Sequence, residues 1–411
     1  MLLTVQRSLH AWAQPIYQNF HYSLKARNYL LQLRCLRRGF TVLALESSAD
    51  DTCAAVVTSE KRILSNVVIS QRKNVETHGG IEPFVAIQEH QRNMPVAVRR
   101  ALQEAQLDMS RIDGIAFTRG PGMAGCLSVC SNAAKTLAAA LGKPLVGVHH
   151  MQAHALTPIL TSTTPSSTPT FPFLTLLISG GHTLLLLALS NSKFRILATT
   201  RDEAVGRAID KVARELRVEL RGRAPGAALE VFCRDGFGGD KKCGKEEENV
   251  PHVEPLKVPF KGELAFSFAG LHSAVDRYIL QHGKDKTRLQ LPYPHRLAIA
   301  RTFQDAAFAQ LEEKVILALR WCADNSQIPV KHVVVSGGVA SNLLFRERLQ
   351  ACLSKNFPDD ELSLVFPPPA LCTDNAAMIA WASMHRFLAG ESDDYSIEHR
   401  AKWSIEKLDA S

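Results

Sequence analysis

Short apolar runs alternate with amphipathic segments through most of the chain. Two of these runs, 41–60 and 173–189, are interrupted by a polar or glycine-rich turn, and each therefore predicts a hairpin of two buried strands. Single strands are predicted at 112–120, 143–148 and 331–338, each followed by a segment with helical spacing. This alternation of strands and helices indicates an α/β protein.

Longer helices are predicted at 85–107 and 296–322. A shorter helix is expected from about Asp202, with Thr200 and Glu203 forming a capping box at its start. Asp210 interrupts the apolar face of this shorter helix. Such an aspartate either pairs with a neighbouring basic residue, here Lys211 or Arg214, or accepts a hydrogen bond from a ribose hydroxyl.

The two hairpins begin two halves of similar design. The segment between them, TSTTPSSTPT, is of low complexity and predicts a flexible surface connection, and the charged, glycine-rich segment after residue 233 predicts a loop insertion. We therefore expect a first α/β lobe at 41–160 completed by a C-terminal helix at about 375–390, a connector at 161–170, a second α/β lobe at 171–374 with an insertion at about 234–258, and a C-terminal tail at 391–411.

The net charge of +8 is concentrated at the N-terminus. Residues 1–40 contain six basic residues and no acidic one, and removing them leaves 42 basic against 40 acidic residues, or +2. The overall charge is therefore poor support for nucleic-acid binding. An acid-free segment rich in Arg, Ser, Leu and Tyr predicts a mitochondrial presequence; the alternative is a basic tail.

The nine cysteines are scattered and form no Cys-x-x-Cys pair, which fits a reducing compartment and no structural zinc ribbon. Residues 171–189 have the length of a membrane span, but the Ser-Gly-Gly-His-Thr at their centre favours a hairpin. We therefore expect no association with a membrane.

Two histidines four residues apart, His150 and His154 in the run HHMQAH, share one face of a predicted helix. Both imidazoles can then reach one metal ion, although packing explains such pairs more often. Asp374, in the run CTDNAAM, stands at a helix start and is either an N-cap or a metal carboxylate. Asp50 and Asp51 are interpreted as turn formers in the first hairpin.

Two glycine pairs follow apolar strands, in SGGHT (179–183) and SGGVASN (336–342). Glycine lets the backbone approach a phosphate closely, while a plain hairpin turn is the alternative for the first pair. Asn342 after the second pair either caps a helix or bonds a nucleoside. A nucleotide held between two hairpins, with a third glycine turn near its adenosine, is the plan of the actin-like ATPases. The chain has no P-loop motif.

Nine motifs in this order resemble those of the tRNA N6-adenosine threonylcarbamoyltransferase family, most closely its mitochondrial branch: ALESSADDT, THGGIEPFVAIQEH, GPGMAG, HHMQAH, ISGGHT, IDKVAREL, FSFAGL, SGGVASN and CTDNAAMIA. The resemblance implies the two-lobed actin-like ATPase fold. It also implies transfer of threonylcarbamoyl from threonylcarbamoyl-adenylate, made by a separate synthase, to N6 of the adenosine just 3′ of the anticodon (position 37) of tRNA. A homodimer in the mitochondrial matrix is expected.

The same resemblance assigns site residues. It implies one divalent metal ion (iron, zinc or magnesium) on His150, His154 and Asp374, and binding of the adenylate by Ser179, Gly180, Gly181, Asp210, Gly226, Glu230 and Asn342. The chain departs from the family pattern at Ala49, Gln152 and Arg207, where Cys, Glu and an acidic residue are usual; none of these changes removes an expected ligand.

Three other functions fit parts of the pattern. A metalloprotease would need Glu directly after the first histidine of the pair, and Met151 stands there. An ATP-binding regulatory module would not need an intact His150, His154 and Asp374 set. A sugar kinase would need a catalytic aspartate, which the sequence does not single out.

Overall fold

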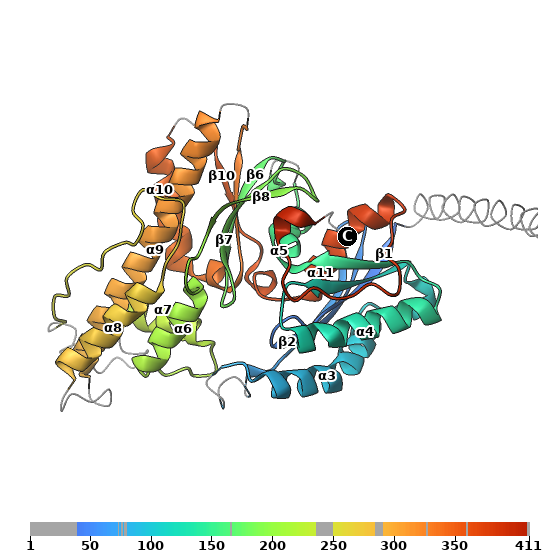
Figure 1. The fold of residues 1–411 in the computed structure, drawn as a ribbon, viewed down its shortest axis with the longest axis horizontal. Helices are drawn as coiled ribbons and strands as arrows, with labels where there is room; N and C mark the ends of the chain where they lie inside the picture. The colour runs from blue at the N-terminus through green and yellow to red at the C-terminus, as the bar shows by residue number, and fades with distance from the viewer. Residues whose placement is uncertain are drawn as a thin grey trace, which may run out of the picture.

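Two five-stranded sheets form the centre of the protein, in a computed structural model that describes residues 39–72, 74, 77, 80–164, 167–235, 250–283, 291–325, 328–358 and 361–408. Figure 1 shows the two sheets in two adjacent lobes. The expected presequence lies almost wholly outside the described residues, as does most of the expected loop insertion.

The first sheet has the strand order β3-β2-β1-β4-β5. Strands β1, β2 and β3 are antiparallel neighbours, and β1, β4 and β5 are parallel. The strands are apolar and mostly buried, because helices cover both faces of the sheet. Their bounds are β1 Thr41–Glu46, β2 Asp51–Thr58, β3 Ile63–Ser70, β4 Gly114–Gly120 and β5 Leu145–His149.

The second sheet repeats this topology, with the strand order β10-β9-β6-β7-β8. Here β6, β7 and β8 are antiparallel, and β6, β9 and β10 are parallel. The hairpin predicted at 173–189 is confirmed, as is the internal repeat. The bounds are β6 Phe173–Ile178, β7 Thr183–Ala188, β8 Phe194–Thr199, β9 His332–Ser336 and β10 Ser363–Val365.

The helices form three layers around the two sheets (Figure 1). Helices α3 (Pro83–Glu104) and α4 (Ala124–Ala140) pack on the outer face of the first sheet. Helices α5 (His150–Thr161) and α11 (Ala376–Leu388) lie between the sheets, in a core to which both contribute. The outer face of the second sheet is covered by α6 (Val205–Glu215), α7 (Pro225–Asp235), α8 (Ala269–His282), α9 (Tyr293–Asp324) and α10 (Leu343–Asn356).

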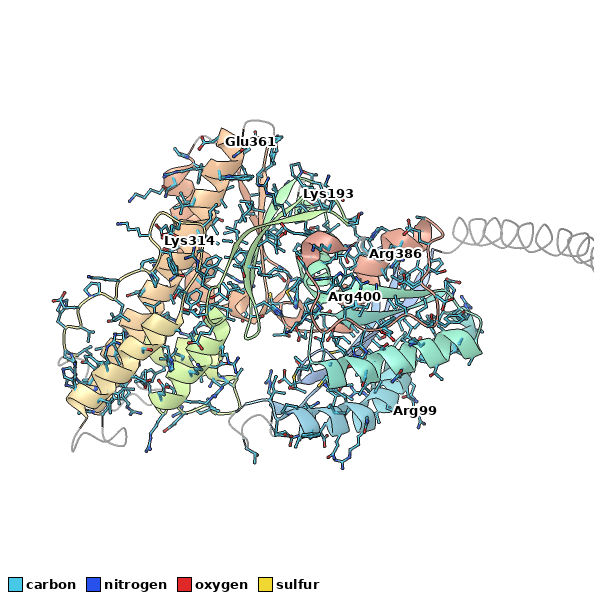
Figure 2. The ribbon with its side chains drawn as sticks, viewed as in Figure 1. Arg99, Lys193, Lys314, Glu361, Arg386 and Arg400 are labelled. Atoms are coloured by element: carbon cyan, nitrogen blue, oxygen red, sulfur yellow. The ribbon has the colours of Figure 1, made fainter. Side chains whose placement is uncertain are left out.

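The expected C-terminal tail is packed rather than loose up to residue 408. Figure 2 shows Arg386 on α11, and both of its terminal nitrogens donate to the carboxylate of Asp393 at 2.8 and 3.0 Å. Asp393 also pairs with the edge of β5 through a backbone bond to Leu145. Further on, Glu406 accepts a hydrogen bond from the backbone of Ile196 in the second lobe at 2.8 Å. The segment therefore links the two lobes.

Several boundaries differ from the sequence predictions. Helix α6 begins at Val205, and the predicted capping box is wrong, because Glu203 pairs with Lys211 while the Thr200 hydroxyl donates to the Glu203 carbonyl. Helix α7 extends to Asp235 and so includes the first two residues of the insertion expected at about 234–258. Among the described residues no helix is long and apolar enough to cross a membrane.

Candidate metal centre and nucleotide cleft

The two histidines of the HHMQAH run stand in the first turns of α5, directly after β5. His149 is the N-cap residue, and its Nδ1 accepts a hydrogen bond from the backbone of Met151 at 3.2 Å. His150 and His154 are only 4% and 3% exposed, and their rings meet edge to face at 4.8 Å. The strand end and the cap thus fix both imidazoles on one buried face between the lobes.

Asp374 faces these histidines from the other side. The N-cap of α11 is Asn375, whose Oδ1 accepts from Met378 at 3.0 Å, so Asp374 is not the helix cap. The Oδ1 of Asp374 instead lies 3.1 Å from His154 Nε2 and 3.4 Å from His150 Nε2. The donor atoms of the three residues lie within 4.8 Å of one another. Two imidazoles and a carboxylate in this arrangement fit a divalent transition ion.

Glu46, at the end of β1, supports this cluster from behind. Its Oε2 lies 3.1 Å from His150 Nδ1, and the carboxylate also receives hydrogen bonds from the Ser48 backbone and the Thr118 hydroxyl. Burial alone would raise the pKa of Glu46, but its interactions with His150 outweigh burial and lower it. An ionised Glu46 orients His150 so that Nε2 faces Asp374.

Glu46 is not among the site residues predicted from the sequence. The signal was present, because a charged residue at the end of the wholly buried strand TVLALE requires a partner.

Asp50 and Asp51, which the sequence pattern predicts as turn formers, also belong to this region. Burial and the charges of Asp50 and Asp374 raise the pKa of Asp51 to about 7. Burial and the charge of Asp374 likewise raise the pKa of Asp50. His182, from the SGGHT turn, lies 6.4 Å from the His150 ring, and burial and His150 lower its pKa to about 4. Both hairpin turns therefore face the same centre.

A cavity of about 420 Å³ adjoins the centre and is lined mainly by residues of the second lobe. Thr373, the neighbour of Asp374, is part of its wall. The structure brings five of the seven predicted substrate residues into the lining: Gly180, Asp210, Gly226, Glu230 and Asn342. A larger cavity of about 840 Å³ lies between α3 and α4, on the opposite face of the first sheet from the histidines.

Ser179 and Gly181 do not line the cavity. The Ser179 hydroxyl accepts a hydrogen bond from the His182 backbone at 3.0 Å and so shapes the turn. A Cβ atom at Gly180 or Gly181 would meet nothing within 4 Å, so open space lies over this turn. At Gly337, in contrast, φ is +100° and a Cβ would lie 2.3 Å from the Ile178 carbonyl oxygen, so the protein itself requires glycine there.

The polar groups of the cavity are held by backbone hydrogen bonds. Asp210 Oδ1 accepts from Gly226 at 3.0 Å, and Glu230 Oε1 accepts from Leu343 at 2.8 Å. Burial raises the pKa of both carboxyls. At Asp210 the charge of Arg214 opposes this increase. Asn342 caps α10, since its Oδ1 accepts from Phe345 at 2.9 Å, and this leaves its amide nitrogen for a ligand.

Comparison with known proteins identifies the family. Residues 62–381 match the family model described as TsaD, tRNA N6-adenosine threonylcarbamoyltransferase. The mitochondrial tRNA N6-adenosine threonylcarbamoyltransferase of Schizosaccharomyces pombe is 38% identical, over 90% of this chain and 88% of that one. The probable mitochondrial enzyme of Arabidopsis thaliana is 36% identical, over 89% of this chain and 74% of that one.

A solved structure supports the fold. HypF from T. kodakarensis superposes with a TM-score of 0.50 at 16% identity, over 86% of this chain and 48% of that one. Together with the two repeated sheets, this confirms the two-lobed actin-like ATPase fold. The chain belongs to the tRNA N6-adenosine threonylcarbamoyltransferase family, whose members are transferases that act on tRNA.

Proposed function

We propose that the chain transfers threonylcarbamoyl from threonylcarbamoyl-adenylate to N6 of the adenosine just 3′ of the anticodon (position 37) of mitochondrial tRNAs. The observation that supports this most is the continuity of the two parts of the site. Thr373 lines the cavity, and Asp374, the next residue, faces both histidines. An adenylate bound in the cavity would place its reactive end beside a cluster of metal-type donors.

In this proposal the adenylate lies along the second lobe. The turn of Ser179, Gly180 and Gly181 faces its phosphate, because the space over both glycines admits a close approach of the ligand. Asp210 accepts a ribose hydroxyl. The remaining proposed contacts lie near the adenosine and come from Gly226, Glu230 and Asn342.

His150, His154 and Asp374 would hold one divalent ion, either iron, zinc or magnesium. When bound, such an ion supplies polarisation of the carbonyl or phosphate oxygens. Three protein donors leave coordination positions open for those oxygens, as a catalytic site requires. The carboxylate of Glu46 on the far nitrogen of His150 is the supporting contact that metal-binding histidines usually have.

The reaction needs little from the protein beyond orientation and charge stabilisation, because the substrate is a mixed anhydride. N6 attacks the carbonyl carbon, the bond from that carbon to the phosphate oxygen breaks, and AMP leaves. The proton that N6 loses is released to solvent. Backbone amides of the 179–181 turn would stabilise the charge that develops on the phosphate.

We also propose that the mature chain acts in the mitochondrial matrix as a homodimer, after removal of residues 1 to about 40. Its support is the acid-free N-terminal segment and the mitochondrial names of relatives from Schizosaccharomyces pombe and Arabidopsis thaliana. Light scattering of the purified chain from residue 40 onward tests the dimer directly.

Mass spectrometry of nucleosides tests the function. Mitochondrial tRNA from cells that lack the chain should have lost N6-threonylcarbamoyladenosine, while cytosolic tRNA from the same cells keeps it. Re-expression of the intact chain should restore the nucleoside, and His154→Ala should not. Normal levels in mitochondrial tRNA without the chain would contradict the proposal.

A further inference from the structure

A second group of metal-type donors lies in the second lobe, between α6 and α8, two helices that pack against each other (Figure 1). Glu215 is the last residue of α6, and His272 and Asp276 stand one turn apart on α8. The i,i+4 spacing puts the imidazole and the carboxylate of α8 on one face, toward α6. The donor atoms of the three residues lie within 4.8 Å of one another.

This group is half-buried and rich in carboxylates. The side chains of Glu215 and His272 are 17% and 15% exposed. His272 Nε2 lies 2.6 Å from Glu215 Oε1, and its Nδ1 lies 3.7 Å from Oε1 of a further carboxylate, Glu203. The other oxygen of Glu203, Oε2, accepts a hydrogen bond from Lys211 Nζ at 2.6 Å. Three carboxylates thus surround one imidazole and one ammonium.

The hydrogen bonds within the group do not satisfy all of its oxygens. Glu203 Oε1 is buried from solvent and receives no hydrogen bond from any described residue, whereas the carboxyls of Glu215 and Asp276 share a hydrogen bond. Burial raises the pKa of the Glu215 carboxyl, and the neighbouring Asp276 also raises it against the opposing effect of His272. Buried carboxylate oxygens without donors are costly, and a cation bound among them would remove that cost.

We propose that Glu215, His272 and Asp276 bind a divalent transition ion, with zinc as its best representative, at a site separate from the centre of His150, His154 and Asp374. One imidazole and two carboxylates are a ligand set that zinc accepts, and Glu203 or water completes the tetrahedron. On binding, the proton shared between His272 Nε2 and Glu215 is released to solvent, and both atoms move apart to bond the ion.

The position of this site indicates a structural role. The ion would join the C-terminal end of α6 to the middle of α8, and α6 carries Asp210, which lines the nucleotide cavity five residues earlier. A fixed α6 would hold Asp210 and its partner Gly226 in place. The ion itself would not touch the reacting atoms.

Zinc binding to the metal-free protein tests the proposal. The chain from residue 40 onward is stripped with chelator, and zinc equivalents are counted by equilibrium dialysis with elemental analysis. The wild type should hold one equivalent more than either His272→Gln or Asp276→Asn. The control is His252→Gln, which changes a histidine that also faces a glutamate but is 80% exposed; it should match the wild type.

The result also separates this site from the proposed catalytic centre. His154→Gln should lose its own equivalent, whatever happens at His272. If the catalytic centre binds no zinc, the wild type holds one equivalent and His272→Gln holds none. Zinc should raise the thermal midpoint of the wild type by several degrees, and by less in Asp276→Asn. Equal zinc content in the wild type, His272→Gln and Asp276→Asn would overturn the proposal.

The conservative variants keep this test interpretable. Asp276→Asn changes charge but hardly changes shape, so its circular dichroism should match that of the wild type. If His272→Gln does not fold, the comparison of Asp276→Asn with the wild type decides the matter on its own.

Discussion

His150 Nδ1 lies 3.1 Å from Glu46 Oε2, and the Glu46 side chain has no exposed surface. The contact joins the end of the first strand of the chain to the first turn of α5, 104 residues later. It fixes which nitrogen of His150 faces Asp374, since a proton between Nδ1 and the carboxylate leaves Nε2 as the ligand. The geometry of the candidate centre is therefore set from outside it.

Glu46→Gln should weaken metal binding by roughly 10- to 100-fold, because the amide cannot stabilise the Nδ1 proton as a carboxylate does. The fold should hold, since glutamine fills the same space. Titration of the metal-free protein measures the affinity. Glu89→Gln, at an exposed pair with Arg92, is the matched control and should have no effect. An unchanged affinity in Glu46→Gln would show that the contact serves packing only.

Asp210→Ala should weaken binding of the adenylate or of ATP by roughly 10- to 100-fold, the range expected for a lost hydrogen bond to a charged group. The metal content should not change, because Asp210 is not among the metal-type donors. Calorimetry with ATP and elemental analysis measure the two quantities on the same sample. Normal nucleotide affinity would reduce Asp210 to the residue that holds the Gly226 backbone.

We predict that the free energy of unfolding falls in mild acid because of the buried, neutral His90. Its Nε2 lies 3.0 Å from the Ala49 carbonyl oxygen and its Nδ1 lies 2.7 Å from the Thr52 hydroxyl, so the neutral ring fixes both ends of the first hairpin turn. Burial lowers the pKa of His90, outweighing the Ala49 bond and the charge of Glu46. The unfolded chain then binds a proton more readily, and the free energy of unfolding falls as the pH drops below about 6.5.

Denaturant unfolding between pH 7.5 and 5 tests this prediction for His90. Burial also lowers the pKa of His149 and His182, so the total slope has several sources. The comparison is therefore between slopes: His90→Gln should flatten the loss, whereas the exposed His252→Gln should leave it unchanged. Equal slopes in all three proteins would contradict the role of His90.

The N-terminal segment should be removed on import. The first described core residue is Phe40, which is 3% exposed and directly precedes β1, so cleavage near this point leaves the fold intact. Sequencing of the N-terminus of the protein from isolated mitochondria should find a start near residue 40. A mature protein that begins at Met1, or one found only in the cytosol, would contradict the prediction.

Local patterns predicted much of this fold and part of the site. Strands such as FLTLLI and TLLLLA can be located from the sequence alone, because each is an apolar run bounded by turn residues. His150 and His154 were found because four residues along a helix is a local spacing. Asp374 could be recognised only through its motif, since nothing in the local pattern separates it from Asn375 as the helix cap.

The features that the sequence did not reveal depend on distant partners. The capping box at Thr200 does not form, because Asp202 bonds to Ser267 and Phe268, more than sixty residues away, and sets the entry to α6. Asp50 and Asp51 have the composition of a turn, and their place beside Asp374 depends on how α11 packs on the first sheet, more than 300 residues further along the chain. The same is true of Glu215 and His272, which only the pairing of α6 with α8 brings together.

Single-turnover transfer with the purified chain tests the central proposal most directly. Metal-loaded protein, synthetic threonylcarbamoyl-adenylate and unmodified mitochondrial tRNA are mixed, and the modified adenosine is counted in the same sample as the metal. We predict that His154→Ala and Asp374→Ala lose metal and transfer together while the circular dichroism stays that of the wild type. Full transfer by a folded, metal-free His154→Ala, Asp374→Ala double variant would contradict the proposal that these residues act through a metal ion.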